Sequence, residues 1–287
     1  MSSSLRLDVY LVKNGFAENR TKAQQLIKNG NVSVNNKVVL KPAFECDETC
    51  VLDVKKPEIE FVSRGAYKLL GAIKDFNLNF NNKCVLDVGS STGGFCDCAL
   101  KNGAKLVVAV DVGQNQLHKT LRESKKVLMF EKTDIRELKL PNDIRPEILT
   151  ADLSFISLTK VVESFKNFSS VKEFVLLIKP QFECGMLLAK KYKGVITNFE
   201  IHRDVILRVI TVFEKNELYL KNLSVSPIKG GDGNVEYLAY FTRNYNNLNI
   251  SETIDNVIRQ AKQKGAKNVW KIGRSIKPLW CKKFRFK

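Results

Sequence analysis

The chain has 287 residues, of which 44% are hydrophobic and 27% charged, a balance typical of a globular protein with one large and one small domain. No apolar run approaches the roughly 20 residues of a membrane-spanning helix, and the first residues lack the layout of a secretory signal, so a secreted or membrane-spanning protein is disfavoured and a cytoplasmic one is expected. The 47 Lys and Arg against 30 Asp and Glu give a net charge of +17, which favours a polyanionic partner, nucleic acid ahead of a membrane surface, over a simple abundance of surface lysines.

The cysteines point to a reducing compartment. There are seven of them, an odd number, and free thiols are the natural interpretation. Cys96 and Cys98 are spaced like a metal-binding pair, but the chain holds two histidines and no second cysteine pair with ligand spacing. We therefore expect no metal and interpret both thiols as small buried side chains.

Residues 1–57 predict a small α+β domain. Apolar residues between Leu5 and Val12 predict a first helix, and Arg20–Lys28 predict a second one with Asn19 as its N-cap. A hairpin follows, with its turn at the pair Asn35-Asn36.

This first segment resembles the alpha-L RNA-binding motif, which is found in a small-subunit ribosomal protein and in many pseudouridine synthases. The matching residues are Arg6-Leu7-Asp8, Gly15, Arg20, Ala23, Ile27, Gly30-Asn31-Val32-Ser33-Val34-Asn35 and Lys41-Pro42. The resemblance implies that the second helix and the hairpin face RNA backbone, where basic side chains neutralise phosphates. The expected contacts, for which a solvated helix face is the alternative, are Arg6, Arg20, Lys22, Lys28, Lys41 and, beyond this domain, Arg64.

After Pro57 we expect a linker over residues 58–62 and a large α/β domain over residues 63–247. From residue 84 onward short apolar runs alternate with helix-length stretches, which predicts a mostly parallel sheet with helices on both faces. The expected strands are Cys84–Val88, Leu106–Val110, Val127–Phe130, Ile148–Ala151, Phe174–Ile178 and a final hairpin-like pair, Leu218–Val225 and Glu236–Thr242.

A glycine-rich loop follows the first of these strands. It contains Asp87, Gly89, Ser90, Ser91, Thr92, Gly93 and Gly94, and its spacing does not fit a dinucleotide fingerprint. Asp111 ends the second strand, where a carboxylate can bind both hydroxyls of a ribose, and Asp134 follows the third, where it can face an adenine amino group. Together these residues predict a site for S-adenosylmethionine, and a plain turn with two helix-capping aspartates is the alternative.

Four further polar residues stand at the ends of helices or strands. Lys68 lies in a helix before the first strand, Asp152 and Lys179 follow the fourth and fifth strands, and Glu236 opens the last one. Because the carboxyl ends of parallel strands meet at one edge of a sheet, we expect Asp152 and Lys179 to lie close together beside the glycine-rich loop. For each residue alone, a surface ion pair is the alternative.

The order Lys68, Asp152, Lys179, Glu236 resembles the tetrad of FtsJ-like ribose 2′-O-methyltransferases, and with the alpha-L segment in front the chain is similar to the TlyA family, often labelled hemolysins. The matching segments are Val62-Ser63-Arg64-Gly65, Asp87–Phe95, Asp111–Leu117, Asp152–Leu158, Lys179–Glu183 and Gly233–Tyr237. One departure is Glu58-Ile59-Glu60-Phe61, which stands where relatives can carry a linker with Arg and Trp.

The resemblance implies a Rossmann-like fold with a seven-stranded sheet. It also implies S-adenosylmethionine-dependent methylation of cytidine ribose 2′-hydroxyls in ribosomal RNA of the small subunit, the large subunit or both, with ribosomal RNA or ribosomal subunits as partners. A non-catalytic RNA-binding or ribosome-assembly protein is the main alternative, and a pore-forming hemolysin is disfavoured because no membrane-spanning segment is found. The oligomeric state is not predicted.

The residue types of the tetrad suit this chemistry without a metal. A ribose hydroxyl must lose its proton as it attacks, and a lysine with a lowered pKa can take that proton or hold the forming alkoxide. We expect Lys179 to lie nearest the hydroxyl, a neighbouring cation at Lys68 to lower the lysine pKa, and Asp152 and Glu236 to orient the two amines.

Residues 248–287 predict a basic extension. They hold 11 basic and 2 acidic residues together with Trp270 and Trp280, and a helix is expected from Glu252 to Lys264. This composition favours an RNA-binding extension, and packing of the aromatic residues onto the large domain is the alternative.

Overall fold

A computed structural model of the chain describes residues 4–28, 30–55 and 60–266. Its contacts divide the described residues into a small unit that ends at Glu60 and a larger unit from Phe61 to Ala266. The expected linker over residues 58–62 therefore lies across this division, although residues 56–59 are outside the described ranges.

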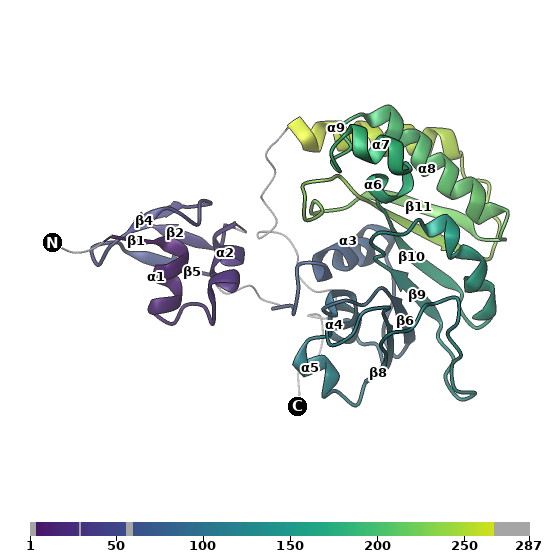
Figure 1. Cartoon of the computed structure of the whole chain (residues 1–287), viewed down its shortest axis with the longest axis horizontal. Helices are drawn as coiled ribbons and strands as arrows, with labels where there is room; N and C mark the ends of the chain where they lie inside the picture. Colours follow the sequence, from purple (N-terminus) through teal and green to yellow (C-terminus); the bar gives the residue numbers. More distant parts are fainter. Residues whose placement is uncertain (1–3, 29, 56–59, 267–287) are drawn as a thin grey trace, which may run out of the picture. The chain divides into compact units, whose positions relative to one another are not determined.

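The small unit consists of two helices and short strands around one core (Figure 1). Its elements are β1 (Leu5–Arg6), α1 (Leu7–Lys13), α2 (Arg20–Lys28), β2 (Val32–Val34), β3 (Lys37–Val38), β4 (Glu45–Cys46) and β5 (Leu52–Val54). Strand β2 pairs with β3 and β5, β1 pairs with β4, and all three pairs are antiparallel. Helices α1 and α2 pack against each other through Leu7, Leu11, Ala23 and Ile27, which are fully buried.

Both local signals predicted for this unit are confirmed. The Asn19 side chain accepts a hydrogen bond from the backbone N–H of Lys22 at 3.0 Å, as an N-cap does. Asn35 and Asn36 have φ of 51° and 63°, the left-handed values that a tight two-residue hairpin turn requires. The chain direction is thus reversed by the two residues expected to reverse it.

The larger unit is built on a seven-stranded sheet in the order β11-β12-β10-β9-β6-β7-β8. The strands are β6 (Cys84–Val88), β7 (Leu106–Val110), β8 (Val127–Phe130), β9 (Ile148–Ala151), β10 (Glu173–Ile178), β11 (Tyr219–Val225) and β12 (Tyr237–Thr242). Only β12 runs antiparallel to its neighbours β10 and β11, and the other pairs are parallel. The predicted strands are confirmed to within one residue at each end, and Glu236 precedes β12 rather than opening it.

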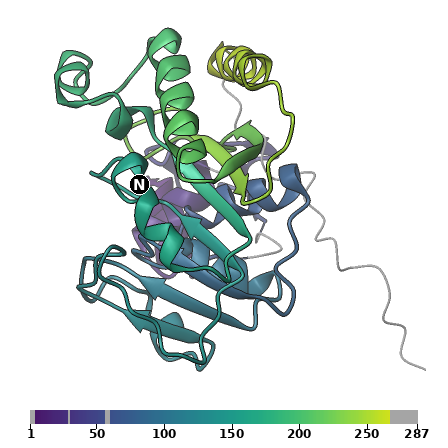
Figure 2. The same cartoon turned by 90° about the vertical axis from the view of Figure 1, so that its right-hand side faces the viewer.

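Helices cover both faces of this sheet, as Figures 1 and 2 show. They are α3 (Ala66–Phe76), α4 (Gly94–Lys101), α5 (Lys119–Arg122), α6 (Pro180–Glu183), α7 (Met186–Lys191), α8 (Phe199–Glu214) and α9 (Ile250–Ala266), with 3-10 turns η1 (Leu158–Lys160) and η2 (Val162–Asn167). Helices α3 and α4 pack against each other, and α8 contacts α6, η1 and β11. All five residues of the central strand β6 are buried, as expected for a parallel strand covered on both sides.

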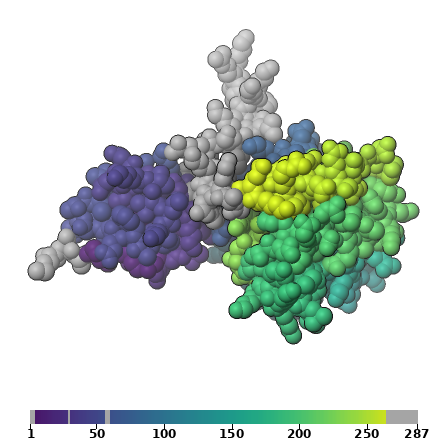
Figure 3. All heavy atoms as spheres, turned by 90° about the horizontal axis from the view of Figure 1, so that it is seen from above, coloured from purple at the N-terminus to yellow at the C-terminus, as the bar shows by residue number. Residues whose placement is uncertain are grey.

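Helix α9 belongs to this unit and corrects the domain boundary expected at residue 247. It packs on α8 and on the edge strand β11 through Ile254, Val257, Ile258 and Ala261, which are buried in the main core. Figure 3 shows α9, in yellow, lying along the surface of the unit. The helix expected over residues 252–264 is confirmed and extends further at both ends. Its apolar stripe packs on α8 and β11, a contact that the sequence does not reveal. Trp270 and Trp280 lie outside the described residues.

Candidate active site

The four residues of the predicted tetrad form one continuous chain of ion pairs. Lys179 Nζ lies 2.7 Å from Asp152 Oδ1, and Asp152 Oδ2 lies 3.2 Å from Lys68 Nζ. Lys68 Nζ in turn lies 2.8 Å from Glu236 Oε2. The residues come from α3, from the positions just after β9 and β10 and from the position just before β12, so the fold brings together side chains up to 168 positions apart.

The two ammonium groups and the two carboxylates are largely removed from solvent, and Glu236 is only 2% exposed. Burying single charges would be costly, but two cations and two anions in alternation compensate each other. Although burial raises the pKa of Asp152, Lys179 and Lys68 lower it below its ordinary value. The carboxyl group of Asp152 is therefore held in its ionised form between the two lysines.

The protonation state of Lys68 depends on its two carboxylate partners. The sequence predicts Lys68 as a cation beside Lys179. Although burial does lower the pKa of Lys68, the carboxylates of Asp152 and Glu236 outweigh this effect and raise it. Lys68 thus stays an ammonium, whereas Lys179 contacts one carboxylate, Asp152, and the hydroxyl of Ser154 at 2.9 Å.

A cavity of about 380 Å³ has the tetrad in its wall. Its lining also includes Gly89, Ser90, Ser91, Thr92 and Gly94 of the glycine-rich loop and the predicted RNA contact Arg64. The other loop and aspartate residues of the predicted cofactor site, namely Asp87, Gly93, Asp111 and Asp134, are not part of this lining.

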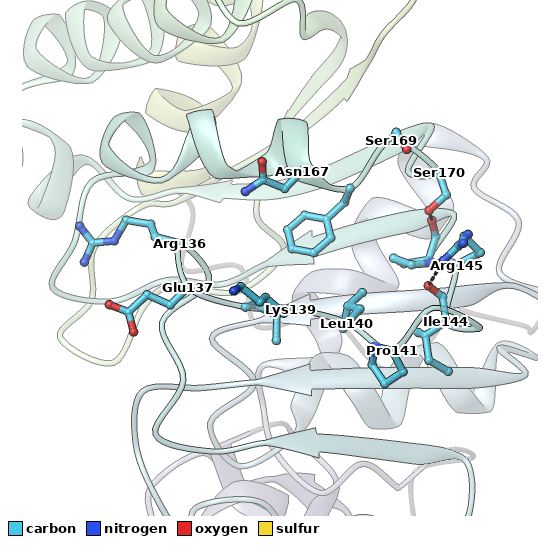
Figure 4. A pocket seen from close by; sticks show the side chains of 13 residues that line it. Arg136, Glu137, Lys139, Leu140, Pro141, Ile144, Arg145, Asn167, Ser169 and Ser170 are labelled. Atoms are coloured by element: carbon cyan, nitrogen blue, oxygen red, sulfur yellow. Dashed lines mark hydrogen bonds between the residues drawn. The ribbon is translucent and has the colours of Figure 1, made fainter.

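A larger cavity of about 520 Å³ lies elsewhere in the same unit, lined by residues 136–141, 144–146 and 167–170 (Figure 4). None of the predicted catalytic or cofactor-binding residues belongs to its lining. We place the candidate active site in the smaller cavity, because buried titratable groups converge there.

The glycine-rich loop is held close to the tetrad. Gly89 has φ of +78°, and a Cβ atom at this position would lie 3.2 Å from the carbonyl oxygen of Asp152. Asp111 tethers the same loop, since its two carboxylate oxygens accept the backbone N–H groups of Ser91 and Gly113, each at 2.7 Å. Each oxygen keeps a further lone pair, so Asp111 can also accept hydroxyl groups.

Two other predicted cofactor residues, Asp87 and Asp134, already have hydrogen-bond or ion-pair partners within the protein. Asp87 is buried and accepts hydrogen bonds from the thiol of Cys96 at 3.0 Å and from the hydroxyl of Thr150 at 2.7 Å, and burial raises its pKa to about 6. It therefore joins β6 to α4 and β9. Asp134 is paired with Arg136 at 2.6 Å. Among the described residues, no group of three His, Cys, Asp or Glu side chains could hold a metal ion.

Two aromatic residues at the cavity, Phe155 and Phe182, are not predicted as site residues from the sequence. Phe155 is 92% exposed and has φ of +65°, and its ring lies 5.1 Å from that of Phe182. Both rings line the cavity. Single phenylalanines among other apolar residues resemble core positions, so only the exposure revealed by the fold distinguishes them.

In the small unit, the predicted RNA contacts Arg6 and Arg20 converge on a fully buried carboxylate. Their Nε atoms lie 3.1 Å and 3.0 Å from Asp8, and Gln24 donates to it at 2.8 Å. The hydrogen bond from Arg6 is the largest cause of a lowered Asp8 pKa. About half of each guanidinium side chain is exposed, so donors remain for phosphates.

The other predicted contacts of this unit lie on its surface. Lys28 and Lys41 are exposed, and Lys22 pairs with Glu60 at 2.9 Å.

Comparison with known proteins identifies one family for each of the two units. Residues 61–243 match the FtsJ-like methyltransferase family, and residues 5–49 match the S4 domain. The chain is 42% identical to YqxC of Bacillus subtilis (strain 168), over 83% of this chain and 86% of that protein. It is 34% identical to the 16S/23S rRNA (cytidine-2'-O)-methyltransferase TlyA of Mycobacterium tuberculosis (strain ATCC 25618 / H37Rv), over 92% of this chain and all of that protein.

Among solved structures, a hemolysin-named protein from Streptococcus thermophilus matches with a TM-score of 0.69 and 34% identity, over 93% of this chain and 99% of that one. Both family matches and these near full-length relatives agree with the order of the two units. The chain belongs to the FtsJ-like methyltransferases, within the group that carries an S4 domain in front of the catalytic unit and includes the TlyA proteins.

Proposed function

We propose that the chain transfers a methyl group from S-adenosylmethionine to ribose 2′-hydroxyls of cytidine in ribosomal RNA. The observation that carries this proposal is the ion-paired chain Lys179–Asp152–Lys68–Glu236 in a cavity whose wall also contains the glycine-rich loop. The name of the TlyA protein of Mycobacterium tuberculosis supports cytidine of ribosomal RNA as the substrate.

The cofactor would bind along the glycine-rich loop, where it supplies a methyl group on a positively charged sulfur. Asp111 has free lone pairs for the two ribose hydroxyls, and it already positions the loop through Ser91. Asp134 would face the adenine amino group from its pairing with Arg136, and Asp87 would act indirectly by holding β6 and α4 in place. These residues fit a cationic nucleoside ligand.

Lys179 would act on the ribose hydroxyl. In its neutral form Lys179 Nζ would take the hydroxyl proton as the ribose oxygen bonds to the methyl carbon, and the electron pair of the broken carbon–sulfur bond would stay on the sulfur. Asp152 orients Nζ from one side and Ser154 from the other. Lys68 would remain a cation in contact with both carboxylates of the tetrad, so neither carboxylate would lose its last cationic partner when Lys179 changes its protonation state.

The substrate would be held at two places. Arg64 in the cavity wall and the basic residues of the small unit, Arg6 and Arg20 among them, would bind phosphates. Phe155 and Phe182 offer apolar faces at the cavity, and an unpaired base stacked on such a ring gains about 1–3 kcal/mol. A non-catalytic RNA-binding role would leave the buried tetrad without a purpose.

Some relatives carry the name hemolysin. In this chain, however, none of the helices within the described residues is long and apolar enough to cross a bilayer.

The test is a map of ribose methylation. Ribosomal RNA would be isolated from cells that lack the protein and from the same cells that express either the full chain or the variant Lys179→Ala, and 2′-O-methylated nucleotides would be located by mass spectrometry. We expect cytidine methylation only with the unaltered chain. Identical methylation in all three samples would contradict the proposal.

A further inference from the structure

A second contact joins the two chain segments that carry the central ion pair. Glu183 is the last residue of α6, four positions after Lys179, and it is only 4% exposed. Its Oε1 accepts the backbone N–H of Leu158 at 2.7 Å, and its Oε2 accepts the hydroxyl of Ser157. The loop that begins at Asp152 is therefore attached to α6 at its far end as well.

The loop between these attachments holds an unfavourable conformation. Phe155 has a positive φ, which is unfavourable for an aromatic residue, and its side chain gains no burial in return. At the start of the loop the Asp152 N–H donates to Val88 at 3.3 Å, and the Asp152 carboxylate is held by the two lysines. At its end, Glu183 holds Ser157 and Leu158.

We propose that Glu183 is a positioning residue that clamps the loop Asp152–Ser157 through Ser157 and Leu158, so that Ser154 meets Lys179 and Phe155 stays at the cavity. Its effect on catalysis rests on the proposed function. Glu183 does not line the cavity, so it acts through the loop. Without the clamp the loop relaxes, the ring of Phe155 leaves the cavity wall, and Lys179 loses its second partner.

The clamp depends on two hydrogen bonds, to Leu158 and to Ser157, rather than on a negative charge. Burial raises the pKa of Glu183, against the lowering effect of the Ser157 and Leu158 hydrogen bonds, so the site does not favour the charge itself. A glutamine keeps the geometry, because its oxygen accepts from Leu158 N–H and its amide group donates to the Ser157 oxygen. A methionine of similar length fills the space but removes both bonds.

The experiment compares the full-length variants Glu183→Gln and Glu183→Met with the unaltered chain. We would measure kcat for methyl transfer to ribosomal RNA, the affinity for S-adenosylmethionine by calorimetry, and backbone hydrogen exchange by mass spectrometry. We expect Glu183→Met to lower kcat by about 100-fold, since misplacement of reacting groups by about 1 Å has such an effect. Hydrogen exchange should rise in residues 153–158 only, cofactor affinity should change less than about threefold, and Glu183→Gln should restore most of kcat.

Three results would overturn the inference. Equal kcat in the two variants at the wild-type level would show that the clamp has no catalytic effect, and equal loss in both would assign the effect to the charge. Faster exchange throughout the core would assign Glu183 a general role in stability. If the unaltered chain methylates no RNA while exchange still rises only at residues 153–158 in Glu183→Met, the clamp stands and the proposed function fails.

Discussion

Lys179 and Asp152 form an ion pair of 2.7 Å that joins the carboxyl ends of the neighbouring parallel strands β10 and β9. The other oxygen of Asp152 faces Lys68 at 3.2 Å, so one carboxylate stands between two ammonium groups. Within the described residues, Lys68 has a second carboxylate partner, Glu236, whereas Lys179 pairs with Asp152 alone. This asymmetry is the reason why we propose Lys179, rather than Lys68, as the lysine that acts on the ribose hydroxyl.

The variant Lys179→Ala should lose methyl transfer while it still binds RNA and cofactor. Proton transfer by a positioned side chain contributes about 10²–10⁴-fold to rate, so kcat should fall at least 100-fold in a radiolabelled methyl-transfer assay. Lys172→Ala is a matched control, because Lys172 is exposed just before the same strand. Substantial turnover by Lys179→Ala at saturating substrate would reject Lys179 as the central group.

The variant Asp111→Ala should weaken binding of S-adenosylmethionine by at least about tenfold, because a hydrogen bond to a charged group contributes about 1.5–3 kcal/mol. Two effects combine here, since the same carboxylate binds the expected ribose hydroxyls and holds the backbone of Ser91. Calorimetry measures the affinity, with Asp143→Ala at an exposed position as the control. Equal affinity in both variants would remove Asp111 from the cofactor site.

The variant Gly230→Ala should lower activity without a large loss of stability. A Cβ atom at Gly230 would lie 2.6 Å from Glu236 Oε1, which would push the carboxylate away from Lys68. Gly231→Ala is the neighbouring control, since a Cβ there meets no atom within 4 Å. We expect kcat to fall by about 10–100-fold only in Gly230→Ala, with melting temperatures of both variants near the wild type. Equal activities would show that Glu236 tolerates displacement.

The buried carboxylate of Asp87 should make stability depend on pH. Its pKa is raised to about 6 in the folded protein, so its contribution is fully present below its ordinary pKa near 4 and is lost as the pH rises through about 6. The variant Asp87→Asn cannot ionise. Its free energy of unfolding relative to wild type should therefore increase by about 2–3 kcal/mol between pH 4 and pH 8, measured by urea denaturation. A difference that does not vary with pH would refute this assignment.

Removal of α9 should unfold or strongly destabilise the larger unit. Ile254 is fully buried in the core, and truncation of one such large side chain costs about 2–5 kcal/mol. A chain shortened to residues 1–266 should keep its cooperative melting transition, whereas one shortened to residues 1–247 should lose it or melt at a much lower temperature. Identical melting of the two shortened chains would mean that α9 is dispensable.

The local order of the chain was readable from its sequence. The short apolar runs predicted as strands form the strands of the sheet, because a parallel strand covered on both faces is built mainly from apolar side chains. The turn at Asn35-Asn36 was readable for a similarly local reason, since asparagine tolerates positive φ. The convergence of Asp152 and Lys179 followed from a rule about strand ends, which needs no side-chain detail.

The tertiary structure alone decided how each side chain is used. The sequence predicted that Lys68 and Glu236 belong to one site, but only the fold places them 2.8 Å apart and thereby raises the pKa of Lys68. The fold also leaves Phe155 exposed at the cavity and buries Glu183 outside the cavity lining. Periodicity and turn residues act over a few positions and so determine the elements, whereas burial, charge compensation and strain arise between residues that are distant in the chain.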